Sequence, residues 1–268
     1  PKTIGRISGL GWGLGYIGGI VALGIVVVLS QFDLLPAEDG LGYRLIAVGA
    51  AVWTLVFSIP IWRNVPEGAP HGDQTRVGFL RSYAILVQDL ARLFRDHRPT
   101  FWFLLASAVY RDGLAGVFAF GGVLAAVAFG FPPTEVMLFG IAANVVAGIS
   151  TIVAGRFDDR FGGRAVIIFS LSGLVVMGVV MFALAGQGRI VFWVSGLLLS
   201  AFVGPAQAAS RSLLARVTPA GMQGEIFGLY ATTGRVASFI APLMWSTFIA
   251  IAASTIWGVL GITLVLLV

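Results

Sequence analysis

Three charged side chains stand deep inside long apolar runs, where charges are rare. Arg111 and Asp112 come about eleven residues after one run begins near residue 100, and Arg235 lies about nine residues into another. If both runs are helices, a rise of about 1.5 Å per residue places these charges roughly 14–17 Å from the helix starts. A charge near the centre of a membrane is costly, so such residues normally face an interior, pair with another group or line a water path.

The two neighbouring charges cannot act in one direction. Adjacent residues of a helix point about 100° apart, so one of Arg111 and Asp112 can bind a solute while the other pairs with a different helix. Together with Arg235 they leave one positive charge that a carboxylate-bearing solute could neutralise. Asp112 could also bind an ammonium group or carry a coupling proton. The alternative is a structural ion network with no part in binding.

A second charged cluster is the decamer GRFDDRFGGR at residues 155–164. Gly155 and Gly162 permit a tight turn and a close approach of helices. Asp159 can accept hydrogen bonds from the N–H groups at the start of a neighbouring helix, or pair with an arginine. Contacts of this kind can be broken, as a conformational latch requires. The alternative is an ordinary basic turn between two helices.

The composition indicates a polytopic membrane protein. The chain has 268 residues, of which 58% are hydrophobic and 11% charged, whereas soluble domains are about 45–50% apolar and 25% charged. The net charge of +5 is attributed to cytoplasmic loops rather than to nucleic-acid binding. Absence of cysteine excludes disulfides and cysteine metal sites, and the lone His71 and His97 are read as surface residues. No metal and no cofactor are predicted.

Hydropathy and length predict an all-α fold with about eight membrane helices. Pro205 and Pro242 fall inside two of them and can kink their helices. The last segment is too short to span and is predicted to be truncated. The predicted spans are about 8–30, 43–62, 100–130, 134–155, 164–186, 189–211, 225–251 and 254–268.

Basic residues fall on alternate connections and predict the orientation. By the positive-inside rule the start of the chain and the segments 63–98, 155–164 and 211–224 are cytoplasmic. The segment 63–98 contains an amphipathic helix, which is predicted to lie at the membrane interface, with a solvated linker helix as the alternative. One face carries Arg81, Gln88, Arg92 and Arg95, and another carries Leu80, Tyr83, Val87, Leu90 and Phe94.

The decamer resembles the loop signature of the major facilitator superfamily. Gly155, Asp159, Arg160, Gly162 and Arg164 match the pattern G-x-[LF]-x-D-[RK]-x-G-x-[RK]. The sequence differs from the pattern at two positions. Asp158 stands where a small residue is usual, and Gly163 stands where a basic residue is common. The stretches 8–19, 110–114, 207–219 and 225–235 are similar to the Atg22-like branch of that superfamily. This branch includes vacuolar amino-acid effluxers and uncharacterised bacterial permeases.

The resemblance implies a domain organisation. In that superfamily the signature recurs after the second helix of each six-helix half. Residues 1–62 would then be the last two helices of the N-terminal half, and the first four helices would be missing. Residues 63–98 would be a cytoplasmic linker, and 99–268 the C-terminal six-helix bundle with its last helix truncated.

The resemblance also implies which helices line the solute cavity. These are the first and fourth helices of the C-terminal half, and they bring in Tyr110 on the former and Ser200 and Gln207 on the latter. The candidates for binding or coupling are therefore Tyr110, Arg111, Asp112, Ser200, Gln207 and Arg235. Gly11, Gly15 and Gly19 repeat at every fourth residue and are predicted to pack against a neighbouring helix.

The predicted function is secondary transport by alternating access. The solute is small, with an amino acid as a candidate, and a proton is a candidate coupling ion. The protein is expected to be a monomer in a bacterial cytoplasmic membrane. No GxxxxGK[ST], HExxH or GxSxG motif is present, so no enzymatic activity is predicted. A non-transporting sensor on the same fold and, third, a membrane-embedded enzyme are the alternatives.

Overall fold

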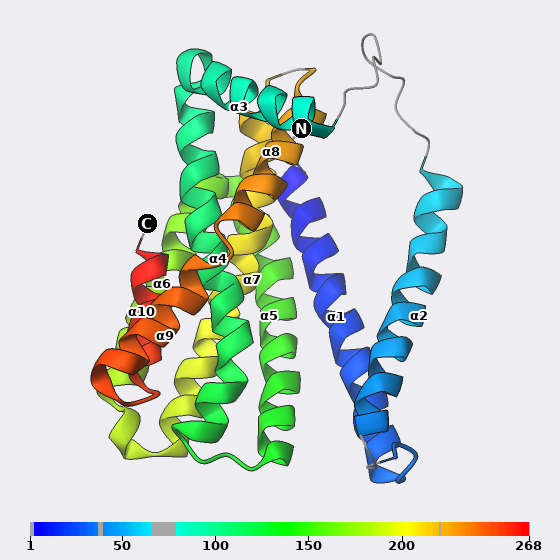
Figure 1. The fold of residues 1–268 in the computed structure, drawn as a ribbon, viewed down its shortest axis with the longest axis vertical. Helices are drawn as coiled ribbons and strands as arrows, with labels where there is room; N and C mark the ends of the chain where they lie inside the picture. Colours follow the sequence, from blue (N-terminus) through cyan, green and yellow to red (C-terminus); the bar gives the residue numbers. More distant parts are fainter. Residues whose placement is uncertain (1–2, 37–39, 66–78, 220, 268) are drawn as a thin grey trace. The chain divides into compact units, whose positions relative to one another are not determined.

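The computed structural model describes residues 3–36, 40–65, 79–219 and 221–267, without the side chains of residues 79, 80, 82 and 83. In these ranges the chain is helical and contains no β-strand (Figure 1). The helices are α1 (Ile4–Gln31), α2 (Leu41–Asn64), α3 (Phe79–Asp96), α4 (Arg98–Val127), α5 (Pro133–Phe161), α6 (Gly163–Ala183), the 3-10 helix η2 (Ala185–Gln187), α7 (Arg189–Val217), α8 (Gln223–Val236), α9 (Ile240–Ala252) and α10 (Trp257–Leu266).

Each predicted membrane span corresponds to a helical segment. Within the described residues, seven of these segments are long and apolar enough to cross a membrane, and α10 is a shorter apolar helix. The span Gln223–Ala252 is broken between α8 and α9. Pro242 is the third residue of α9, where it lacks an N–H and its ring clashes with a preceding carbonyl, so it explains the break. Pro205 lies inside α7, which continues past it.

The chain divides into two compact units, one formed by residues 1–17 with 85–268 and the other by 18–84. In the second unit, Gly42 is the one buried residue among those of α2, and Leu55, Val56 and Phe57 are exposed. Because a soluble helix would bury such a face, these apolar side chains fit a lipid or helix environment. The division of the chain into halves at a linker, expected from the sequence, stays a prediction.

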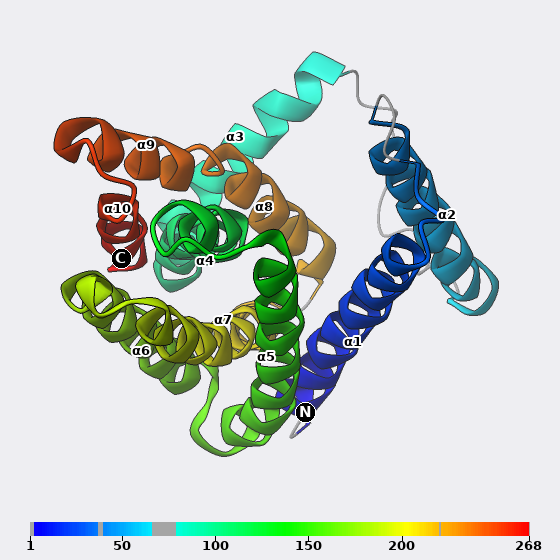
Figure 2. The same cartoon turned by 90° about the horizontal axis from the view of Figure 1, so that it is seen from below.

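The core of the first unit lies among helices α4 to α10. Figure 2 looks along them and shows α10 beside α6 and α9, and α5 beside α7. Leu114, Leu174 and Val203 are fully buried at the centre of this packing. Helices that bury one stripe against each other and expose apolar residues elsewhere match a bundle that lipid surrounds.

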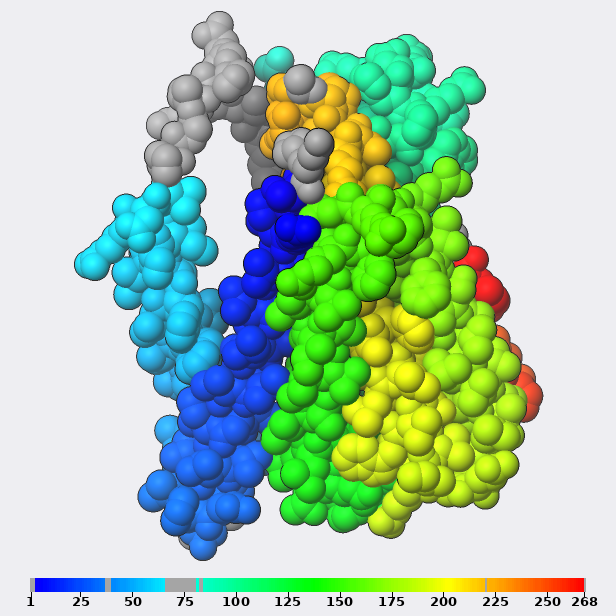
Figure 3. Space-filling view, turned by 180° about the vertical axis from the view of Figure 1, so that it is seen from behind, coloured from blue at the N-terminus to red at the C-terminus, as the bar shows by residue number. Residues whose placement is uncertain are grey.

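The start of α1 packs against α5 through small residues. Gly5, Gly9 and Gly13 are buried, and Figure 3 shows the first turns of α1, in dark blue, lying against α5, in green. A Cβ atom added at Gly9 would come within 2.8 Å of the Thr151 carbonyl oxygen, and one at Gly155 within 2.8 Å of the Gly5 oxygen. Only glycine allows the two backbones to come this close.

The glycines predicted to make this contact lie elsewhere. Gly11, Gly15 and Gly19 are on the exposed side of α1, and a Cβ atom at Gly11 or Gly15 would meet no described atom within 4 Å. Two rows of glycine with the same spacing run along this helix. The row that faces the small residues of α5 packs, and spacing alone does not identify it.

The amphipathic helix is observed as α3, with a different docking face from the predicted one. Leu86, Leu90 and Leu93 pack with Leu104 and Ile226 at one end of the bundle, and Leu93 is fully buried. Of the predicted apolar face, Leu90 takes part, whereas Val87 and Phe94 are 68% and 44% exposed. The side chains of Leu80 and Tyr83, and all of 66–78 with His71, lie outside the described residues.

Candidate functional site

The charged decamer is mostly helix. Residues 155–161 form the end of α5, and α6 begins at Gly163, so the connection is the single residue Gly162. Gly162 has φ 88°, a backbone conformation that favours glycine. The two glycines predicted to make a tight turn therefore have different roles, because Gly155 is helical and serves the close contact with Gly5. A ten-residue turn was the wrong interpretation, since nothing before Gly162 interrupts the helix.

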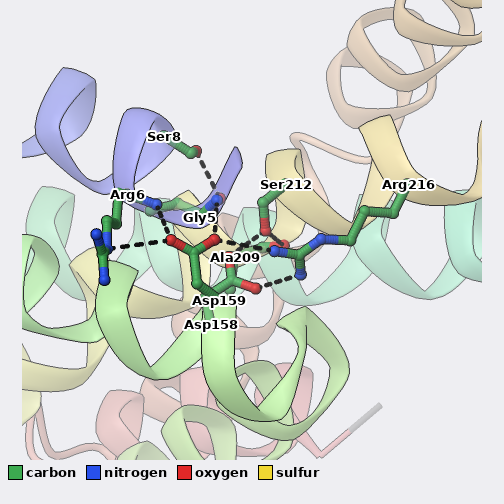
Figure 4. Close-up of polar contacts among 9 residues, drawn as sticks. Gly5, Arg6, Ser8, Asp158, Asp159, Ala209, Ser212 and Arg216 are labelled. Atoms are coloured by element: carbon green, nitrogen blue, oxygen red, sulfur yellow. Dashed lines mark hydrogen bonds and ion pairs between the residues drawn. The ribbon is translucent and has the colours of Figure 1, made fainter. Parts of the chain in front are cut away.

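Asp159 binds the first turn of α1 (Figure 4). One carboxylate oxygen accepts the Gly5 N–H at 2.8 Å, and the other accepts the Arg6 N–H at 3.2 Å. The Arg6 side chain lies 3.5 Å from the same carboxylate, which is 8% exposed. The first N–H groups of a helix have no partner within it and carry the positive end of the helix dipole, so an anion stabilises them. The contact expected from the sequence is present.

Asp158, noted in the sequence only as a departure from the signature, is the more buried carboxylate. It is 2% exposed. Its Oδ1 accepts a hydrogen bond from Arg216 Nη1 at 2.5 Å, and its other oxygen accepts one from the Ser212 hydroxyl. Both partners lie at the end of α7, as Figure 4 shows. A buried carboxylate requires such partners, but the sequence does not indicate which residues they are.

The two carboxylates thus connect three helices at one point. Arg216 Nη2 also reaches Asp159 Oδ1 at 3.4 Å, so the two aspartates share a guanidinium. The Ser8 hydroxyl donates to the Ala208 carbonyl at 2.7 Å and adds a direct contact between α1 and α7. We call Gly5, Arg6, Asp158, Asp159, Ser212 and Arg216 the carboxylate cluster.

The remaining signature residues are less involved. Arg160 and Arg164 are exposed, and the Arg160 guanidinium lies 5.2 Å from the Phe161 ring centre. The ion pairs of the carboxylate cluster use Arg6 and Arg216 instead. Sequence reasoning placed Arg216 in a basic cytoplasmic segment but could not assign it a partner.

The two neighbouring charges of α4 bind either side of the break between α8 and α9. Arg111 Nη1 donates to the Tyr230 carbonyl of α8 at 3.0 Å, and the guanidinium lies 3.9 Å from the Tyr230 ring centre. Asp112 is 7% exposed, and its Oδ2 accepts the Ala241 N–H at the start of α9 at 2.5 Å. The negative charge of Asp112 complements the positive end of the α9 dipole, whereas Arg111 contacts α8 in its middle.

Arg235 stands apart from this pair. It lies in the last turn of α8, directly before the break, and is exposed. In the described part of the chain no ion pair joins it to Asp112. The structure therefore does not bring the three charges together as one group. The depth assigned to them from the sequence stays a prediction, and the side of the helix that each occupies depends on its neighbours.

The uncharged candidate residues lie elsewhere, with Tyr110 on α4 and Ser200 and Gln207 on α7. The Tyr110 hydroxyl, on a 3% exposed residue, is 2.7 Å from Ser210 Oγ, which itself donates to the Ala206 carbonyl. Ser200 is 5% exposed and donates to the Gly196 carbonyl within α7 at 2.9 Å. Gln207 is partly buried. Among the described residues no group of three His, Asp or Glu side chains could hold a metal ion.

Comparison with known proteins identifies the family. A sequence model described as "Vacuole effluxer Atg22 like" matches residues 2–268. The chain belongs to this Atg22-like family. An "Uncharacterized MFS-type transporter YxiO" of Bacillus subtilis is 28% identical over 250 residues, which are 91% of this chain and 56% of that protein.

Fungal members of the family are also similar to the chain. "Autophagy-related protein 22-1" of Aspergillus fumigatus is 26% identical over 264 residues, covering 90% of this chain and 43% of that protein. "Autophagy-related protein 22" of Cryptococcus neoformans is 23% identical over 261 residues, covering 90% and 46%. The chain thus spans about half the length of the curated relatives that it matches. The resemblance seen in the sequence is confirmed, together with the all-α membrane fold.

Proposed function

We propose that the chain is part of a secondary transporter that moves a small solute across a membrane by alternating access. The observation that carries the proposal is the contact of Asp159 with the first turn of α1. The Atg22-like family, which includes a bacterial MFS-type transporter, supports it. In this proposal residues 1–62 end the N-terminal half, 63–98 is a cytoplasmic linker and 99–268 is the C-terminal half.

The carboxylate cluster acts as a latch between the halves. Asp159 stabilises N–H groups of α1, whereas Asp158 holds Ser212 and Arg216 within the six-helix half. When the halves separate on this side, water can satisfy the N–H groups of Gly5 and Arg6, so the contact can break at moderate cost. Asp158 keeps its partners throughout and fixes the end of α5, which positions Asp159 for the latch to form again.

Solute binding is assigned to the region around the helix break. Broken membrane helices of transporters commonly form binding sites because their ends expose unpaired backbone groups. Asp112 holds the start of α9, and Arg111 holds α8 at Tyr230. This leaves Arg235, in the last turn of α8, as the exposed cation beside the break. A carboxylate-bearing solute would neutralise it, and an amino acid is the candidate. Tyr110, Ser200 and Gln207 stay further candidates.

Proton coupling would act through Asp112. A proton on this carboxylate removes the negative charge from the start of α9 and weakens the contact with the Ala241 N–H. The state of the break would then depend on protonation. We place the protein, as a monomer, in a bacterial cytoplasmic membrane, and the Bacillus relative supports this location.

The full-length protein in proteoliposomes tests the proposal. We expect a panel of radiolabelled amino acids to include at least one that crosses the membrane, with a rate that rises in an imposed proton gradient. Binding of a solute without flux would contradict transport and favour the sensor. Flux without any effect of a proton gradient would remove only the coupling ion from the proposal.

A further inference from the structure

A cavity of about 280 Å³ lies in the core of the bundle, towards the connection between α4 and α5. Side chains of α4, α5, α6, α7, α9 and α10 line it. Aromatic rings form much of the wall. Phe120 and Trp245 stack with ring centres 4.7 Å apart, and Phe139 and Phe192 lie 4.7 Å apart. Of the candidate solute residues, Ser200 reaches this cavity, whereas Arg111, Asp112 and Arg235 are absent from its described lining.

The polar groups of the wall are few, and three of them already donate to a backbone carbonyl. The Ser200 hydroxyl donates to the Gly196 carbonyl, the Thr263 hydroxyl to the Val259 carbonyl, and Asn144 Nδ2 to the Gly140 carbonyl. Each of the three can accept one more hydrogen bond but does not require it. The side chains described as lining the cavity carry no formal charge. A charged ligand would lose its hydration there without gaining a side chain of opposite charge among those described as lining the cavity.

We propose that this cavity binds an uncharged, largely apolar small molecule with room for a fused two-ring system, and that the bound molecule restrains α9 against α4. An apolar cavity of about 150 Å³ stays dry and takes benzene, and this one has roughly twice that volume. An occupant would touch Phe120 on α4 and Trp245 on α9. These are the helices that Asp112 joins at the break, so occupancy opposes movement of α9. This ligand site is separate from transport of a charged solute.

Indole is the probe that matches the wall, since it has two fused rings, no charge and one N–H donor. With the purified full-length protein in detergent we expect a saturable rise in melting temperature with indole. Tryptamine and indole-3-acetate carry the same rings with a charge and should give no rise. Absence of a rise with indole, or an equal rise with the charged analogues, overturns the proposed ligand class.

Substitutions that fill the cavity distinguish binding of indole at this site from its partitioning into detergent. Ala143 is buried in the lining, so Ala143→Leu should abolish the indole effect. Gly121→Val is a second filling variant, because a Cβ atom there meets nothing within 4 Å. Ala126→Leu adds the same side chain at an exposed position of α4 and should respond like the wild type. An equal response in both filling variants and the wild type overturns the site.

Hydrogen–deuterium exchange tests the restraint of α9. Backbone amides of peptides from 237–252 should exchange more slowly with indole in the wild type and unchanged in Ala143→Leu. Exchange in 237–252 that stays the same at saturating indole contradicts the restraint, even where the melting temperature rises.

Discussion

Two ion-pair networks at opposite ends of the bundle use the same chemistry in different ways. The carboxylate cluster joins the ends of α5 and α7 to the start of α1. At the other end, Arg189 binds Glu135 at 3.2 Å and the Gly130 carbonyl at 2.6 Å, while Trp193 Nε1 donates to Glu135 at 3.0 Å. We call this second group the Arg189 clamp. All its members lie within residues 130–193.

The two networks differ in the burial of their side chains and in the helices that they join. Asp158 and Asp159 have side chains that are 3% and 8% exposed, whereas those of Glu135 and Arg189 are 25% and 53% exposed. Exposed ion pairs contribute little to stability. In the proposed function, the Arg189 clamp stays within one bundle in every arrangement of the halves. A network can act as a latch only where some of its partners belong to a part that moves, and under that proposal Asp159 meets the condition because its α1 partners belong to the other half.

Asp159→Asn should have the largest effect on transport. The amide loses the charge that faces the α1 N–H groups, Arg6 and Arg216. Hydrogen bonds to charged groups contribute about 1.5–3 kcal/mol, which corresponds to roughly a 10- to 150-fold shift between two conformations. We expect solute flux per molecule to fall about tenfold or more, with little change in melting temperature because Asp158 keeps its partners. Flux in proteoliposomes and a thermal melt measure both.

Glu135→Gln is the matched control for that change. It removes one carboxylate charge from the Arg189 clamp in the same isosteric way. We expect unchanged flux and a loss of about 0–1 kcal/mol in stability. Equal loss of flux in both variants would show that the comparison between the networks is wrong.

Gly9→Ala should loosen the contact between α1 and α5. Its Cβ atom would meet the Thr151 carbonyl oxygen at 2.8 Å, and overpacking of this kind costs about 1–3 kcal/mol. Gly15→Ala makes the same change on the same helix where a Cβ atom meets no described atom within 4 Å. We expect lower melting temperature and flux for Gly9→Ala alone. Similar behaviour of the two variants would argue against the observed packing face.

Substitutions of Asp112 should distinguish a positioning role from a coupling role. Asp112→Ala leaves the Ala241 N–H without its partner, at a cost of about 1–3 kcal/mol. Asp112→Asn keeps an oxygen acceptor there but cannot bind a proton. If the residue only holds the break, Asn restores both stability and flux. If it also carries the coupling proton, Asn restores stability while the response of flux to a proton gradient is lost.

Single cysteine substitutions, which should have the smallest effect on the protein, test on which side of the membrane each end of the bundle lies. The chain contains no cysteine, so single cysteines can be introduced at exposed positions. Arg160→Cys at the carboxylate-cluster end should react with an impermeant maleimide from the cytoplasmic side, and Gly186→Cys at the other end from the outside. Neither change should affect flux. Labelling of both from the same side would overturn the predicted orientation.

Much of the fold follows from local properties of the sequence. Apolar length alone locates the helical segments that can span a membrane. Pro242 lies next to the break, but Pro205 lacks an N–H in the same way and α7 continues past it, so proline alone does not identify the break. The contact of Asp159 with a helix start was also predictable. An acidic residue beside a glycine that allows close approach has few other favourable partners in a membrane protein.

Features that depend on rotation about a helix axis were not predictable. The glycine row of α1 that packs, the face of α3 that docks through Leu93, and the separation of Arg235 from Asp112 are of this kind. In each case two faces have similar composition, and the neighbouring helix selects one. Asp158 was missed for a related reason, because its partners Ser212 and Arg216 lie more than fifty residues away in the sequence.

Distances across the carboxylate cluster test the central claim most directly. Spin labels on Ile7 of α1 and Phe157 of α5, which are 67% and 51% exposed, report whether the latch is open. Labels on Leu138 of α5 and Ile190 of α7, at the Arg189 clamp, are the control pair. By double electron–electron resonance we predict that Asp159→Asn increases a longer-distance population for the first pair and leaves the control pair unchanged. An unchanged distribution for Ile7 and Phe157 would contradict the latch.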